Sequence, residues 1–145
     1  MKRPFSWVVS NFSHTHFGLF AIRLGVGISM MLFHGWGKVS GGPETWERVG
    51  GSMANLGVTV FPVFWGFMAG FSELFCSALV ILGVLFRPAT LLLAITMAVA
   101  VLRHLSLPPD NDAAGWSGAS HALELLAVYV GLFFAGPGRI RFGKF

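Results

Sequence analysis

Four long apolar stretches run along the chain, at about residues 16–38, 61–85, 89–107 and 120–135, with more polar segments between them. A helix needs about 20 apolar residues to cross a bilayer. We therefore predict four membrane-spanning helices. Because successive spans cross the bilayer in opposite directions, the predicted fold class is all-α, an antiparallel four-transmembrane-helix bundle.

The connection between the first two spans carries its own helical pattern. Apolar residues recur there at spacings of three or four, at Trp46, Val49, Met53 and Leu56. Such spacing places them on one helical face, and a proline near the start suits a first turn. We predict a short interfacial helix at about 44–55, which Gly57 ends. Between the second and third spans, we predict a turn at Phe86-Arg87-Pro88.

Composition supports a membrane protein. Hydrophobic residues make up 54% of the 145 residues and charged residues 11%, compared with about 25% charged in soluble domains. Mean hydropathy is +0.71. We expect one membrane domain over residues 1–145. The net charge of +4 comes without a basic run, so we expect no nucleic-acid partner. Cys76 is the only cysteine, which excludes an internal disulfide.

The distribution of charge predicts the orientation in the membrane. Four spans place both termini on one side, and basic residues favour the cytoplasmic side. The basic residues flanking the side of the termini are Lys2, Arg3, Arg87, Arg139, Arg141 and Lys144. Fewer basic residues flank the other side, namely Lys38, Arg48 and Arg103. The acids of the two long loops also lie on that side, and they are Glu44, Glu47, Asp110 and Asp112. We expect both termini in the cytoplasm and the long loops in the periplasm.

One acidic residue, Glu73, lies in the middle of the second apolar stretch. At 1.5 Å per residue it is roughly 18 Å from Phe61, close to mid-membrane. Insertion of an acidic side chain there costs about 2.5–3.5 kcal/mol. Either a hydrogen-bonding partner on a neighbouring helix offsets this cost, or Glu73 belongs to a proton, cation or ligand site.

Other titratable side chains lie on the remaining spans, and they are Arg23, His34, Lys38, His104, His121 and Glu124. Polar groups avoid lipid, so we expect them to converge inside the bundle, in its periplasmic half. Arg23 is the exception because it lies deeper, toward the cytoplasm. It either extends to that surface or pairs with Glu73.

Three interpretations of this polar cluster compete. The first is a structural hydrogen-bonding network. The second is a site for a quinone or similar amphiphile, with Glu73 and His104 as catalytic, proton-exchanging residues. In that case Arg23, His34, Lys38, His121 and Glu124 bind the ligand or balance charge. The third is a metal site, but the single His-x-x-Glu has the reverse order of di-iron bundles, so we predict no metal.

Several short motifs occur in a fixed order along the chain. They are Arg23-Leu24-x-x-Gly27, His34-Gly35-x-x-Lys38, Leu56-Gly57, Ala69-Gly70-x-x-Glu73, Gly83-x-x-x-Arg87, His104, Glu124 and Gly136-Pro137-Gly138-Arg139. From Phe17 to Arg139, the chain resembles the DoxX family. The resemblance implies a four-helix bundle in the bacterial inner membrane. The best-known relatives are membrane subunits of thiosulfate:quinone oxidoreductase, and other members are associated with membrane oxidoreductase assemblies.

We therefore expect a redox-linked protein that binds a quinone-like or other amphiphilic ligand, as a subunit of a quinone-linked oxidoreductase. The alternative is a non-catalytic anchor or assembly subunit whose polar cluster is structural. Expected partners are the lipid bilayer and soluble redox proteins. Gly66 and Gly70 form a small-xxx-small pattern, which indicates either packing within the bundle or a homo-oligomer.

Overall fold

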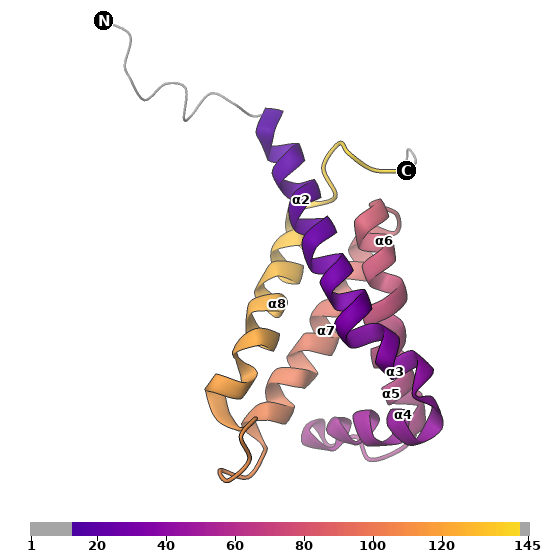
Figure 1. The fold of residues 1–145 in the computed structure, drawn as a ribbon, viewed down its shortest axis with the longest axis vertical. Coiled ribbons are helices and arrows are strands. Elements are labelled where there is room, and N and C mark those ends of the chain that lie inside the picture. Colours follow the sequence, from indigo (N-terminus) through magenta and orange to yellow (C-terminus); the bar gives the residue numbers. More distant parts are fainter. Residues whose placement is uncertain (1–12, 143–145) are drawn as a thin grey trace, which may run out of the picture.

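The computed structural model describes residues 13–142, which form four long helices, with a shorter helical segment between the first two (Figure 1). All four are long and apolar enough to cross a membrane. The first span consists of α2 (Ser13–Met30), a π-helical turn η1 (Met31–Gly35) and α3 (Trp36–Ser40). The second consists of α5 (Pro62–Phe71), a π-helical turn η3 (Ser72–Cys76) and α6 (Ser77–Leu82). The third is α7 (Phe86–Leu105) and the fourth is α8 (Gly115–Ala135). The predicted fold class is confirmed.

The predicted loop helix is also present, as α4 (Gly42–Gly50) followed by a 3₁₀ helix η2 (Gly51–Leu56). Gly57 ends it in a left-handed conformation with φ 76°, which glycine adopts without strain. Two glycines bring α4 against α5. A Cβ on Gly50 would collide with the carbonyl oxygen of Pro62, and a Cβ on Gly66 with that of Trp46.

The turn predicted at Phe86-Arg87-Pro88 is wrong. The chain reverses at Gly83 and Leu85, which have φ values of 73° and 44°, and α7 already begins at Phe86. Pro88 lies in the first turn of α7, where a missing N–H group leaves no hydrogen bond unmade. The fourth span starts at Gly115 rather than 120. The prediction missed this first turn because it contains glycine and serine residues, which do not continue the apolar pattern.

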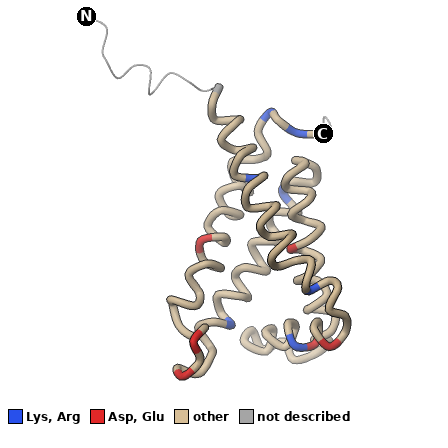
Figure 2. Tube along the Cα trace, in the orientation of Figure 1, with Lys and Arg blue, Asp and Glu red and all other residues tan. Residues whose placement is uncertain are grey.

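The two ends of the bundle differ. The described chain begins and ends at one end, here called the terminal end, whereas residues 41–61 and 106–114 form the other, the loop end (Figure 1). Most charged residues lie at these two ends (Figure 2). The protein is thus a multi-pass membrane protein, and the placement of the termini in the cytoplasm remains a prediction. Lys2, Arg3 and Lys144, on which it partly depends, lie outside the described residues.

The core lies at mid-bundle and includes Met30, Cys76, Val80, Leu93 and Tyr129. Packing is different toward the loop end. There η2 contacts both α5 and α7, and α7 contacts η3. The loop helix thus covers the space between the second and third spans, next to Glu73.

Candidate functional site

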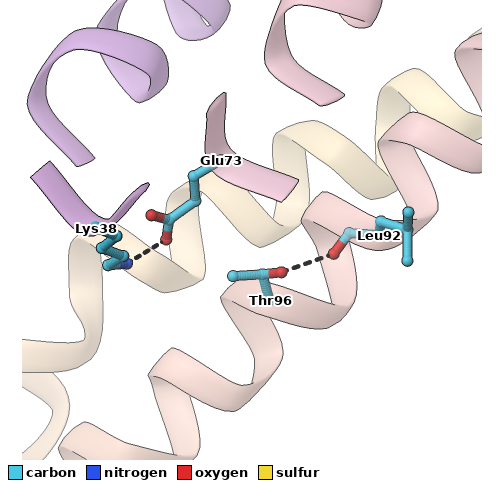
Figure 3. A network of polar contacts seen from close by, with 4 residues as sticks. All are labelled: Lys38, Glu73, Leu92 and Thr96. Carbon is cyan, nitrogen blue, oxygen red and sulfur yellow. Dashed lines mark hydrogen bonds and ion pairs between the residues drawn. The ribbon is translucent and has the colours of Figure 1, made fainter. Parts of the chain in front are cut away.

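Glu73 lies in the π-helical turn of the second span and is 2% exposed. Its Oε1 accepts a hydrogen bond from Lys38 Nζ at 2.5 Å, forming an ion pair between the first two spans (Figure 3). Lys38 retains 29% side-chain exposure. The second oxygen, Oε2, has no hydrogen-bond partner among residues 13–142. The carboxyl is therefore held at one oxygen and free at the other.

The two π-helical turns pack directly on each other. Gly35, in η1, is buried against the backbone of η3. A Cβ at Gly35 would lie 2.6 Å from Leu74 N and 2.7 Å from the carbonyl carbon of Glu73. A π-helical turn adds one residue to a helical turn, and such turns are frequent at functional sites. Here they set the register at which Lys38 meets Glu73.

The small-xxx-small pattern of the second span is used within the chain. Gly66 lies against the backbone of Trp46, and a Cβ at Gly70 would lie 3.2 Å from the Cβ of Lys38. The indole Nε1 of Trp46 also donates to the carbonyl oxygen of Lys38 at 2.7 Å. Both glycines thus help to position the lysine, and a homo-oligomer remains a prediction.

A cavity of about 310 Å³ lies beside this ion pair, between α5, α7 and the loop helix. Glu73, Ser72 and Lys38 line it together with Thr96 and Arg103. Much of the remaining wall is apolar, including Met53, Phe64, Trp65, Met68, Leu92 and Ile95. Its volume falls at the low end of the roughly 300–1,000 Å³ that is typical of ligand sites. The Thr96 hydroxyl donates to the Leu92 carbonyl at 2.9 Å, which leaves its oxygen able to accept.

The predicted site histidines lie in other places. His34 and His121 stack on each other, with ring centroids 5.4 Å apart and planes at 28°, so they join the first and fourth spans. His104 Nδ1 lies 2.7 Å from the Ala113 carbonyl oxygen. Since a carbonyl only accepts, this nitrogen carries the hydrogen and fixes the loop before α8. None of the three lines the cavity beside Glu73.

Arg23 neither reaches the surface nor pairs with Glu73, so both expectations for its position are wrong. Its guanidinium is fully buried and donates to four carbonyl oxygens at 2.5–2.8 Å, those of Val80, Ile81, Pro137 and Ile140. The first two belong to the last turn of α6, where carbonyls lack helical partners. Arg23 thus closes the terminal end and does not line the cavity.

Glu124 is exposed on α8 and forms no ion pair within the described part of the chain. The structure therefore brings together Lys38 and Glu73 from the predicted set, and His34 with His121. The binding roles predicted for Arg23, His121 and Glu124 remain predictions.

Sequence reasoning missed three buried hydroxyl groups. Ser72, Ser77 and Tyr129 are at most 2% exposed, and their hydroxyl groups have no hydrogen-bond partner within residues 13–142. Tyr129 comes from α8 and belongs to the core at mid-bundle. Tyr129 is the single tyrosine of an apolar chain. Because a buried phenol usually has a hydrogen-bond partner, it could have been identified from the sequence as a candidate site residue.

The sequence of this chain matches the DoxX family over residues 18–105, more than half of its length. The protein belongs to the DoxX family. The match includes the first three spans and the loop helix, with Lys38 and Glu73. The fourth span of this DoxX family protein, with Glu124 and Tyr129, lies beyond the matched residues. No curated protein and no solved structure matches the chain.

Proposed function

We propose that this DoxX family protein binds a quinone-like amphiphile in the cavity beside Glu73 and takes part in a redox reaction of the membrane. The observation that carries the proposal is the free Oε2 of a buried carboxyl at the edge of a largely apolar cavity. Such a cavity suits a ligand that combines an apolar ring or chain with an oxygen atom.

Each lining residue then has a chemical role. Phe64, Trp65 and Met68 offer apolar contacts to a ring. The Oε2 of Glu73 hydrogen-bonds the ligand oxygen and exchanges a proton with it, while Lys38 holds Oε1 and orients the carboxyl. A quinone would supply the two-electron chemistry, with electrons exchanged through a partner redox protein. His104 was predicted to share the proton exchange, but its bond to Ala113 and its place outside the cavity leave Glu73 as the basis of the proposal.

Binding of a short-chain ubiquinone by the purified protein tests the role of Glu73. Replacing Glu73 by glutamine preserves shape but removes the negative charge and the exchangeable proton. Loss of one charge-assisted hydrogen bond corresponds to roughly 1.5–3 kcal/mol, so we expect at least about tenfold weaker binding. Tryptophan fluorescence is a suitable readout because Trp65 lines the cavity.

Two control variants accompany this measurement. Glu47→Gln removes an exposed acid of the same type that does not line the cavity, and His104→Ala removes a ring outside the cavity. Both are expected to bind the ubiquinone as the unmodified protein does. Equal affinity of Glu73→Gln and the unmodified protein would reject the proposed site.

The second candidate function is a non-catalytic anchor or assembly subunit. The observation in its favour is that several of the predicted site residues have partners within the protein, since Lys38 pairs with Glu73, His104 bonds Ala113, and Arg23 binds four carbonyls. Under this alternative, Glu73→Gln lowers the thermal stability of the protein. Ubiquinone either does not bind at all or binds the variant and the unmodified protein with equal affinity. Measuring both quantities on the same samples separates the two functions.

A further inference from the structure

A second hollow, of about 510 Å³, lies at the loop end and shares Lys38 with the cavity beside Glu73. Its lining includes His34, Lys38, Arg48 and Arg103, and no aspartate or glutamate. We refer to it as the cationic hollow. Its basic residues come from four separate elements: η1, α3, α4 and α7. The fold, rather than a basic run in the sequence, gathers these charges.

Neither Arg48 nor Arg103 forms an ion pair within residues 13–142. Glu44 and Glu47 belong to the same helix as Arg48, yet neither lines the hollow. Within residues 13–142, the Lys38–Glu73 contact is the one ion pair. Positive groups that are held together around a concave surface raise the local concentration of anions.

We propose that the cationic hollow binds an oxyanion of the carboxylate or phosphate class. Arginine guanidinium groups present paired donors that match the geometry of such anions, and Arg48 and Arg103 approach from different helices. Lys38, whose ammonium group bonds Glu73, also lines the hollow.

Lys38 also links the hollow to Glu73. Lys38, Val49 and Arg103 line both the hollow and the cavity beside Glu73. An anion in the hollow competes with the Glu73 carboxylate for the same ammonium group, so each weakens the interaction of the other with Lys38. Such coupling is reciprocal. Removing the charge of Glu73 therefore strengthens anion binding, which is the opposite of what loss of a structural contact would do.

The anion has two possible sources. One is a soluble oxyanion that enters from the aqueous side, and the other is the headgroup of an anionic lipid whose chain extends into the neighbouring cavity. Two probes distinguish them: inorganic phosphate, and short-chain phosphatidylglycerol compared with phosphatidylcholine of the same chain length.

The experiment is a calorimetric titration of the full-length protein in a neutral detergent at low ionic strength. Arg48→Gln and Arg103→Gln are expected to weaken binding of the effective probe by about fivefold or more, and Glu73→Gln to strengthen it by about fivefold. Arg87→Gln is the matched control, because Arg87 is an exposed arginine at the opposite end of the helix that carries Arg103.

Saturable binding of phosphate alone identifies a soluble anion, whereas selective binding of phosphatidylglycerol identifies a lipid headgroup. The proposal would be overturned if neither probe bound. It would also be overturned if Arg87→Gln weakened binding as much as Arg48→Gln and Arg103→Gln do. Unchanged or weaker binding in Glu73→Gln would overturn the coupling through Lys38. The inference does not depend on quinone binding, since the ubiquinone assay has its own probe and variants.

Discussion

Replacing Gly35 by alanine is expected to destabilise the protein by about 2 kcal/mol, although it adds only one methyl group. The methyl would lie 2.6–2.8 Å from backbone atoms of Glu73 and Leu74, so no side-chain rotation relieves the collision. The first and second spans must separate instead. Because Lys38 and Glu73 bond across this junction at 2.5 Å, the separation also breaks their ion pair.

Thermal unfolding of the purified protein in detergent measures this effect. Gly37→Ala is the matched control, because a Cβ there has no other atom within 4 Å and alanine favours a helix over glycine by up to about 1 kcal/mol. We expect it to be neutral or stabilising. If Gly35→Ala unfolded at the same temperature as Gly37→Ala, the close packing of the two π-helical turns would be refuted.

A double-mutant cycle adds a more specific readout. If Gly35 acts by holding Lys38 against Glu73, then Gly35→Ala and Glu73→Gln remove the same interaction, and their costs do not add. Additive costs would mean that Gly35 supports the bundle without positioning the ion pair.

The fold was predictable because its signals are local. Apolar stretches of spanning length indicate helices in a bilayer, and Pro43 and Gly57 bound the loop helix through their own backbone preferences. The turn after the second span was missed for the same reason. It depends partly on Leu85 in a left-handed conformation, which a leucine rarely adopts and which no local pattern indicates.

The site was only partly predictable. Glu73 was identifiable because an acid in a membrane span must have a partner or a function. Its partner Lys38 depends on two π-helical turns, whose extra residue changes the face on which each side chain lies, and the apolar pattern does not reveal them. The contacts of Arg23 and His104 were hidden because their partners are backbone carbonyls, which every residue carries. Arg48 and Arg103 were interpreted as flanking charges, and only the tertiary fold brings them together.

Replacing Arg23 by methionine is expected to cost about 3 kcal/mol of stability and to release the segment that follows α8. The guanidinium binds carbonyls of Val80 and Ile81 on one side and of Pro137 and Ile140 on the other. Even at the average of about 0.6 kcal/mol for a hydrogen bond in a membrane bundle, four such bonds together contribute more than about 2 kcal/mol to the stability. Charge assistance and the unpaired carbonyls that remain increase the loss.

Arg23→Lys distinguishes geometry from charge. An ammonium group has three donors at one point, whereas the planar guanidinium has five donors that point in different directions. Lysine is therefore expected to recover less than half of the lost stability. Arg139→Gln, an exposed change in the same region, is the control and should leave the unfolding temperature unchanged.

Limited trypsin digestion at Arg139 and Arg141 reports directly on the released segment. In the unmodified protein this segment is held by Arg23 and by a hydrogen bond from Phe142 N to the Leu82 carbonyl at 2.9 Å. Arg23→Met is expected to speed cleavage at both sites, with Arg23→Lys between the two. If Arg23→Lys were as resistant to trypsin as the unmodified protein, a positive charge alone would be enough to hold this segment, and the guanidinium geometry would not be required.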